Sequence, residues 1–295
     1  MASSKGAIVF VGTEEEFLAR VSPEPGAVTV DGQGMVALHP VDIVPTFMGA
    51  HDVPPEYRDR REEYIRLLVD TLIPEVSRRG LAEFFDIFCE PGVFSVEETR
   101  ALIQAAKAAG FKIKVHADEF VTLGGAELAA EVGAASAEHL IAVSEEGIAR
   151  LAASDTAAIL LPGVSFFLMM DKRAPARRLI DAGAVVALAT DFNPGSSNLS
   201  AMPFVLQLGV FTLGMTVEEA INACTGNAAY AVGRHGTVGS LEPGKKMDLL
   251  LCDIPDHVSL AYDAGRNPVR TVIKNGRVVV ADGRMVGERV VAERL

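Results

Sequence analysis

Five polar side chains of this sequence are of types that could bind a metal ion, move a proton or contact a substrate. These are His51, His116, Glu119, His139 and Asp191, and each follows closely on a short apolar stretch. Imidazole nitrogens and carboxylate oxygens are the ligands that a catalytic zinc ion accepts while one position stays open for water. Such an ion lowers the pKa of its bound water to ~7. The pattern indicates metal-dependent hydrolysis, with ordinary polar residues at the rim of a sheet as the alternative.

His116 and Asp191 are the strongest candidates for metal ligands. Glu119, three residues after His116, is expected to face the same site and could carry protons. His139 could stabilise a developing negative charge as an imidazolium ion, or orient the substrate. The remaining histidines begin a strand or lie in turn-rich segments, and are not candidates: His39, His235 and His257.

The candidates follow the strands of a repeated strand–helix pattern in the middle of the chain. Strand-like stretches are predicted at residues 41–47, 84–88, 112–116, 135–139, 157–161 and 185–189, each followed by a helical stretch. Ser95 and Glu98 predict a capping box at the start of one helix. Repeated βα units with apolar strands predict a parallel sheet covered by helices. Because the carboxyl ends of parallel strands share one edge, the candidate side chains are expected to converge there.

Six such units are present, whereas a complete (β/α)8 barrel has eight, and the pattern alone leaves barrel and open sheet as alternatives.

The chain ends differ from the middle. They contain strand-like stretches and turn signals, including a hairpin signal at Asn275-Gly276. The stretches are Ala7–Val11, Ala27–Val30, Asp248–Cys252, Val269–Lys274 and Val278–Ala281. Together the two ends could form one small β domain; two unrelated peripheral hairpins are the alternative.

Bulk properties exclude several classes of protein. The chain has 295 residues, 49% of them hydrophobic and 22% charged, with a formal net charge of -12. An acidic chain without lysine- or arginine-rich runs is not expected to bind nucleic acid or anionic membranes nonspecifically. Its apolar runs are too short to span a bilayer, and its first residues lack a signal-peptide pattern. Three widely spaced cysteines favour free thiols in a reducing cytosol, so a cytoplasmic location is expected.

Several longer motifs resemble the imidazolonepropionase family of the metal-dependent amidohydrolase superfamily. They follow the family's order over nearly the whole chain from Val41 onward. HADEF and ATDFNPGS are the most specific of them, whereas the last one resembles the superfamily at large. The motifs are TFMGAHDVPPEY at Thr46–Tyr57, HADEF at His116–Phe120, GGAELAAEV at Gly124–Val132, ATDFNPGS at Ala189–Ser196, TGNAAYAVG at Thr225–Gly233 and GSLEPGKKMDLL at Gly239–Leu250.

The resemblance implies an α/β fold: a (β/α)8-type amidohydrolase barrel with a small β-sandwich domain made from both chain ends. With about six βα units, the barrel of this chain is expected to be incomplete. The implied domains are residues 1–38, the N-terminal part of the small β domain, residues 39–235, the barrel, and residues 236–295, the C-terminal part of the small domain.

The resemblance also implies roles for individual residues and a zinc or iron cofactor. The metal ligands are His116 and Asp191. The catalytic residues are Glu119, His139 and Asp191, and the substrate-binding residues are His51, Glu119, Asn193, Gly195 and Ser196. The family often has threonine at the position of Ser196, which keeps the hydroxyl. The implied reaction is hydrolysis of the cyclic amide of 4-imidazolone-5-propanoate to N-formimino-L-glutamate, a step of histidine degradation.

One departure from the family pattern is large. The superfamily carries a His-x-His motif at the end of its first barrel strand, and this sequence contains none. The chain passes from Gly34–Leu38, which resembles the lead-in to that strand, directly to His39–Val44, which resembles a later strand, so about two βα units, on the order of a hundred residues, are missing. Another amidohydrolase, such as a deaminase or a dihydroorotase-like enzyme, and a catalytically impaired remnant are the alternatives. A small-molecule substrate is expected, and a homodimer could cover the strand edges left unpaired.

Overall fold

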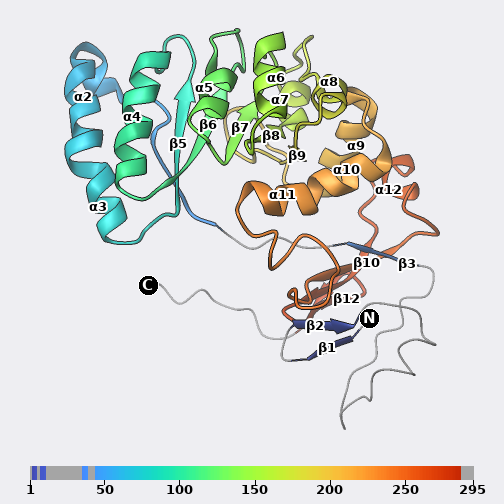
Figure 1. Cartoon of the computed structure of the whole chain (residues 1–295). Helices are drawn as coiled ribbons and strands as arrows, with labels where there is room; N and C mark the ends of the chain where they lie inside the picture. Colours follow the sequence, from blue (N-terminus) through green and yellow to red (C-terminus); the bar gives the residue numbers. More distant parts are fainter. Residues whose placement is uncertain (1, 5–6, 11–34, 39–43, 287–295) are drawn as a thin grey trace. The chain divides into compact units, whose positions relative to one another are not determined.

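The computed structural model describes residues 2–4, 7–10, 35–38 and 44–286 (Figure 1). The chain divides into two compact units. The larger unit is Asp42–Gly233, and the smaller one combines the two chain ends. The domain boundaries expected at residues 38 and 235 stay a prediction.

Six parallel strands form the sheet of the larger unit, in the order β4-β5-β6-β7-β8-β9. This confirms the predicted incomplete barrel of six units. In the described part of the chain, β4 and β9 are the edge strands of this sheet. The strands are β4 (Thr46–Ala50), β5 (Phe84–Cys89), β6 (Lys112–Ala117), β7 (Ser136–His139), β8 (Ala157–Leu160) and β9 (Val186–Leu188).

The first strand lies later than the sequence predicted. A strand over residues 41–47 was expected, whereas β4 spans Thr46–Ala50 and residues 39–43 lie outside the described residues. Val44 and Pro45 are not part of the strand, and Pro45 has no backbone N–H to donate to a neighbouring strand. The shift brings the strand end to Ala50, directly before His51.

Helices connect successive strands. Ser95 begins α4 with the predicted capping box: its hydroxyl accepts the Glu98 N–H at 3.2 Å, and the Glu98 carboxylate accepts the Ser95 N–H at 2.8 Å. The helical segments are η1 (Pro55–Arg60), α2 (Arg61–Leu67), the π-helical turn η2 (Leu68–Leu72), α3 (Ile73–Arg78), α4 (Val96–Ala108), α5 (Gly125–Glu131), α6 (Glu145–Ala152), α7 (Pro162–Phe167), α8 (Ala176–Asp181), α9 (Met202–Leu213), α10 (Val217–Cys224) and α11 (Gly226–Ala231).

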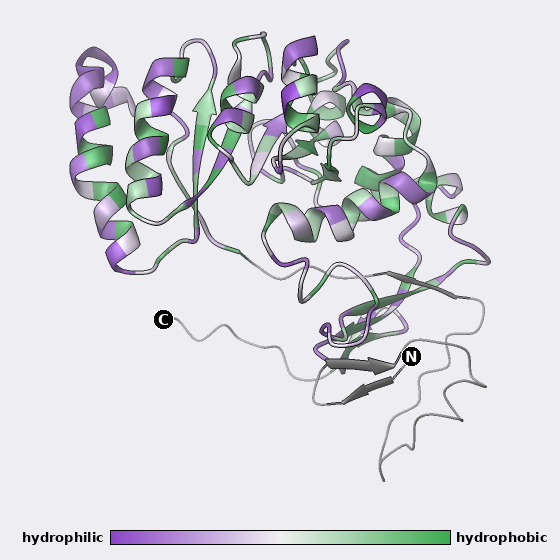
Figure 2. Cartoon of the chain, viewed as in Figure 1, coloured by the Kyte–Doolittle hydropathy of each residue, from purple (hydrophilic) through white to green (hydrophobic). Residues whose placement is uncertain are grey.

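The two faces of the sheet differ in polarity. Ile113, Val115 and Ala117 of β6 are buried on the face that carries the helices, where α5 packs so closely that a Cβ on Gly125 would lie 3.0 Å from the Ala117 Cβ. The other face, which we call the site face, carries Lys114 and His116 by the alternation of a strand. Figure 2 shows helices α2 to α4 alternating between hydrophobic and hydrophilic residues, as expected for helices with one buried side.

The smaller unit contains a five-stranded antiparallel sheet, in the order β13-β12-β11-β10-β3. The pairing of β3 with β10 confirms that strands from both chain ends share one sheet. The predicted turn at Asn275-Gly276 joins β11 to β12, with φ of 50° and 76° at the two residues. The predicted strand Ala27–Val30 lies outside the described residues. The elements are β1 (Ala2–Ser4), β2 (Ala7–Phe10), β3 (Met35–Leu38), β10 (Leu249–Asp253), α12 (Ser259–Tyr262), β11 (Val269–Lys274), β12 (Arg277–Ala281) and β13 (Arg284–Met285).

Candidate active site

The candidate residues lie at the carboxyl ends of the parallel strands. His51 directly follows β4, His116 is the penultimate residue of β6, and His139 ends β7. Glu119 lies two residues beyond β6, and Asp191 three residues beyond β9. Because the strands are parallel and paired in register, these ends form one edge of the sheet. The structure thus places the side chains at the edge where ligands bind in α/β folds.

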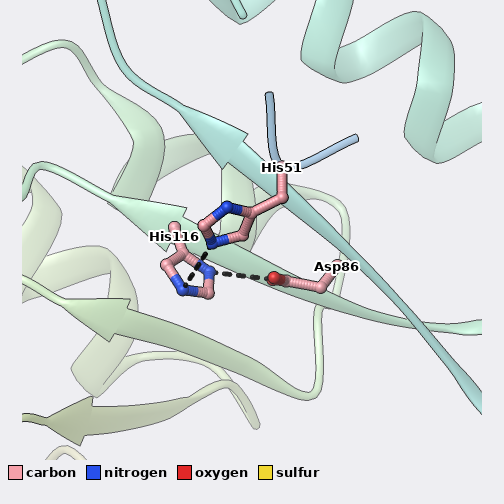
Figure 3. A group of neighbouring side chains, drawn as sticks. All are labelled: His51, Asp86 and His116. Carbon is pink, nitrogen blue, oxygen red and sulfur yellow. Dashed lines mark hydrogen bonds and ion pairs between the residues drawn. The ribbon is translucent and has the colours of Figure 1, made fainter. Parts of the chain in front are cut away.

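His116 is the centre of the group. Its ring centroid lies 4.7 Å from that of His51 and 5.0 Å from that of His139. Its Nδ1 lies 3.0 Å from Oδ1 of Asp86, and its Nε2 lies 3.4 Å from Nε2 of His51 (Figure 3). Asp86 comes from β5, so strands β5 and β6 and the segment directly after β4 contribute to this contact.

Asp86 is the residue that sequence reasoning missed. It lies in the middle of a strand and is 2% exposed, so it carries none of the strand-end signal that marked the other candidates. The signal that could have found it is alternation combined with pairing. Phe88 of β5 pairs with His116 of β6, and Asp86 pairs with Lys114, so all four residues lie on the site face.

Glu119 and His139 form a second contact next to His116. Nδ1 of His139 lies 3.5 Å from Oε1 of Glu119, and both side chains are buried. His139 pairs with Ala117, so strand alternation alone would send its side chain toward the helices. Its φ of 72° is a left-handed conformation that breaks the alternation, and its ring reaches His116. Such strained backbone is found mostly at functional sites.

The three imidazoles differ in their affinity for protons. Burial is the largest single influence on the pKa of His116, and it lowers that pKa. The negative charge of Asp86 and its hydrogen bond act in the opposite direction and together outweigh burial, so that the pKa is raised to about 9. Burial and the positive charge of His116 lower the pKa of His51. The same two causes, burial first, hold the pKa of His139 well below its usual value. Only His116 therefore carries a proton on both nitrogens near neutral pH when no metal is bound.

The two carboxylic acids hold their protons more firmly than usual. Burial, and then the carboxylates of Asp191 and Glu90, raise the pKa of Glu119 to about 7 against the opposing effect of His116. Burial is also the main cause that raises the pKa of Asp191, while His116 lowers it. An acid with a pKa near 7 can both give and accept a proton at neutral pH, as a general acid–base catalyst must.

Replacing Glu119 by glutamine is expected to stabilise the protein at pH 8 and to leave its stability unchanged at pH 4. The unfolded chain loses the Glu119 proton near pH 4.5, whereas the folded protein keeps it up to a pH of about 7. Wild-type stability therefore falls as the pH rises between these values. The gain from Glu119→Gln should reach on the order of 1–3 kcal/mol at pH 8. Urea unfolding in EDTA at both pH values measures it, and equal stabilities at pH 8 would contradict the assigned pKa.

Glu90 holds the segment that carries Glu119. This carboxylate is 3% exposed. Its Oε2 accepts the backbone N–H of Glu119 at 3.2 Å, and its Oε1 accepts those of Phe120 and Val121 at 3.1 and 2.9 Å. Asp118 anchors the next part of the loop, since its buried carboxylate accepts four further N–H groups, those of Leu123, Gly124, Gly125 and Ala126. Glu119 therefore extends from a loop that is tied down on both sides.

Glu90→Gln is expected to loosen this loop. The amide nitrogen of glutamine cannot accept a hydrogen bond, so at least one of the three N–H groups loses its partner. Hydrogen exchange at Glu119, Phe120 and Val121 should accelerate by at least roughly tenfold, because a lost buried hydrogen bond costs about 1–3 kcal/mol. Glu62→Gln, at an exposed helix position, is the matched control. Unchanged exchange at all three amides in Glu90→Gln would show that the carboxylate does not order the loop.

The loop after β9 is organised by Asn193. The side-chain nitrogen of Asn193 donates to the backbone carbonyl of Asp191 at 2.8 Å, and its Oδ1 accepts the N–H groups of Gly195 and Ser196 at 2.8 Å each. The structure therefore brings Asn193, Gly195 and Ser196 together beside Asp191, whose φ is 47°. These contacts give Asn193 a local role in shaping the loop, and whether it also contacts a substrate stays a prediction.

A buried ion pair lies beside His116 on the site face. Nζ of Lys114 is 3.2 Å from Oε1 of Glu138 and 2.8 Å from the hydroxyl of Ser136. The second oxygen of Glu138 accepts the Val115 N–H at 3.1 Å. The opposite charges of this pair compensate each other, whereas Asp86 is the carboxylate that most strongly raises the pKa of His116.

The donor set fits a divalent metal ion. His51, Asp86 and His116 each offer a ligand atom, and these atoms lie within 4.8 Å of one another. Within the described residues, Oδ2 of Asp86 is one of few buried side-chain atoms without a hydrogen-bond partner. A buried polar atom without a partner is costly and needs an explanation, and a bound cation would remove the cost. Two imidazoles with one carboxylate form a set typical of catalytic zinc.

Known proteins resemble the chain in sequence. The profile of the amidohydrolase family matches residues 48–279. An imidazolonepropionase of Geobacillus kaustophilus (strain HTA426) is 57% identical over 247 residues, which are 84% of this chain and 58% of that protein. The imidazolonepropionase of Treponema denticola is 49% identical over 248 residues, 84% of this chain and 60% of that protein. The chain thus spans about three fifths of the length of the curated relatives that it matches.

Solved structures resemble it in fold. An N-isopropylammelide isopropylaminohydrolase from Burkholderia multivorans has a TM-score of 0.70 and 15% identity, covering 96% of this chain and 95% of the other. An adenosine deaminase from Xanthomonas campestris, solved with bound zinc, has a TM-score of 0.68 and 15% identity, covering 98% and 90%. At such identity the likeness concerns the fold alone. Within the part of the chain that the structure describes, none of the helices combines the length and the apolar composition of a membrane span.

Proposed function

This chain belongs to the amidohydrolase family, and on that basis we propose that it carries the imidazolonepropionase activity. The reaction adds water to 4-imidazolone-5-propanoate, breaks the ring amide C–N bond and yields N-formimino-L-glutamate in histidine degradation. The observation that carries the proposal is the packing of His116 against His51, Asp86 and His139, with Glu119 beside them, at the end of parallel strands. The identity of 57% to an imidazolonepropionase supports this substrate over others.

His116 and Asp191 are the residues that we assign to a divalent metal, zinc or iron. The two side chains are close enough for each to shift the pKa of the other. A divalent ion held there would supply polarisation of the ring carbonyl and would make water more acidic. Asp86 keeps the His116 ring in place through Nδ1, which leaves Nε2 free for the metal.

Proton transfer is the task of three residues. Asp191 is assigned to accept the proton of the attacking water. Glu119, with a pKa of about 7, can deliver a proton to the ring nitrogen that leaves the carbonyl carbon. His139, close to Glu119, can donate a hydrogen bond to the oxygen that becomes negative. The family motifs assign the substrate contacts to His51, Glu119, Asn193, Gly195 and Ser196.

A catalytically impaired member of the family is the second candidate. The observation that favours it is the absence of any His-x-His motif in the sequence. A catalytic zinc site has at least three protein ligands, and the family motifs match only two of them to positions of this chain. Binding of metal and hydrolysis of substrate are therefore separate questions for this protein.

A substrate panel tests the proposal. Residues 1–295 are loaded with zinc or iron at high protein concentration and incubated with imidazolone propanoate, dihydroorotate and adenosine. We expect N-formimino-L-glutamate from the first compound and no product from the other two. A product from dihydroorotate or adenosine alone would replace the proposed substrate, and no product from any compound would favour the impaired member.

We further propose that the protein acts in the cytoplasm on its small-molecule substrate and forms a homodimer. Three free cysteines, Cys89, Cys224 and Cys252, are consistent with a reducing compartment. The edge strands β4 and β9 each have one partner strand in the described chain, and such edges favour association with another chain. Light scattering after size exclusion measures the mass, and a monomer at micromolar concentration would contradict the dimer.

A further inference from the structure

The two central histidines of the site, His51 and His116, approach each other through their Nε2 atoms. Nε2 of His51 lies 3.4 Å from Nε2 of His116, and the rings meet edge-on at an interplanar angle of 84°. Figure 3 shows the contact between these two nitrogens and the separate contact of the other His116 nitrogen with Asp86. The distance of 3.4 Å is longer than is usual for a hydrogen bond donated by an N–H group.

The spacing matches two ligands of one tetrahedral ion. Zinc binds imidazole nitrogen at about 2.0–2.1 Å, so two imidazoles on neighbouring corners of a tetrahedron have nitrogens about 3.3–3.4 Å apart. The observed 3.4 Å falls in this range without any movement of the backbone.

Asp86 contacts the other ring nitrogen of His116, Nδ1. Its Oδ1 lies 3.0 Å from Nδ1 of His116, which fixes the proton on Nδ1 when the ring is neutral and exposes the lone pair of Nε2 toward His51. A carboxylate in this position is the common partner of a metal-binding histidine. Asp86 is 2% exposed and its other oxygen has no hydrogen-bond partner in the described structure, so its negative charge is available to balance a cation.

We propose that His51 is a metal ligand in this chain and that His51 and His116 bind one divalent cation through their Nε2 atoms, with Asp86 orienting His116. The family motif assigns His51 to the substrate, where a His-x-His pair already serves the metal. In this sequence the pair is missing, and His51 supplies a second imidazole nitrogen beside that of His116. A histidine bound to the metal no longer contacts the substrate, so the chain should keep a metal better than it keeps turnover.

The inference concerns the site of the proposed function and rests on the family's use of a metal there. Its test contains no substrate, so failure of the metal site and failure of the proposed reaction are told apart. Residues 1–295 are labelled with ¹⁵N-histidine, stripped with EDTA and titrated with zinc. We expect one equivalent of zinc to shift the Nε2 resonances of His51 and His116 together.

Variants test the same site by competition with a chelator. His51→Ala and His51→Gln should each weaken zinc binding by at least roughly tenfold, and Asp86→Asn by about 10–100-fold, the usual effect of removing a carboxylate behind a ligand histidine. His257→Ala, in the other compact unit, is the control and should leave the affinity unchanged. Circular dichroism verifies that each variant is folded.

Three results would overturn the proposal. The first is wild-type affinity in both His51 variants while His116→Ala loses zinc. The second is a shift of the His116 and His139 resonances with none at His51. The third is the absence of stoichiometric zinc binding by the wild-type chain.

Discussion

Asp191→Asn is expected to abolish measurable hydrolysis in a version of the enzyme that carries the missing barrel units, while the fold stays intact. Asparagine has the size of aspartate but neither the anionic ligand for the metal nor the group that accepts a proton from water. The loss of the proton acceptor alone should lower kcat by roughly 10²–10⁴-fold. Asn193 also donates to the backbone and the carboxylate of Asp191, and both contacts keep an acceptor oxygen in the variant.

The measurement needs an active reference and a matched control. A segment of about two βα units from an imidazolonepropionase relative is inserted between Leu38 and His39, and turnover and circular dichroism are recorded with and without Asp191→Asn. Asp171→Asn removes a carboxylate at an exposed position of the same unit and should leave kcat unchanged. Near-wild-type turnover in Asp191→Asn would remove Asp191 from the mechanism.

The inserted segment itself is expected to have the second large effect. Relative to residues 1–295 alone, the completed chain should bind zinc more than about 100-fold more tightly, because even partners behind the ligands contribute 10–100-fold. Turnover of imidazolone propanoate should rise by at least the same factor. The segment supplies the His-x-His ligands and frees His51 for the substrate, so both quantities should change together.

A control separates the ligands from the scaffold. The same insertion with both histidines of the His-x-His motif replaced by alanine completes the sheet without adding ligands. It should raise the thermal stability, since β4 and β9 gain neighbours, and should leave turnover near that of the shorter chain. Equal turnover of the completed chain and of residues 1–295 would show that the missing units are not needed for catalysis.

The site as described has a consequence for metal-free protein. Two imidazoles, those of His51 and His139, pack around His116 beside the buried carboxyl groups of Asp86 and Glu119. The carboxylates favour a proton on His116, and the proton then disfavours charge on His51 and His139. Binding of a divalent cation must displace that proton, since a ligand nitrogen cannot keep it. Zinc binding should therefore release protons and weaken at low pH.

Much of the fold could be predicted from the sequence, because its determinants are local. The capping box at Ser95 and Glu98 and the turn at Asn275-Gly276 depend on residues within a few positions of each other, and both are present in the structure. The six strands followed by helices also came from local periodicity, and parallel pairing then fixed a shared edge for His116, His139 and Asp191. The first strand was misplaced because its predicted range, residues 41–47, included Pro45, which precedes the actual strand.

Only the tertiary structure decided how the candidates touch. Alternation assigns a side chain to one face of the sheet, but the register between strands decides which residues meet. The register that pairs Phe88 with His116 places Asp86 on the same face, within reach of the His116 ring. The left-handed φ of His139, which turns its ring toward His116, depends on the packing around the strand end and leaves no trace in the sequence. The contact between His51 and His116 joins residues 65 positions apart. The sequence thus determined which residue types could bind a metal, whereas long-range packing determined which of these side chains come into contact.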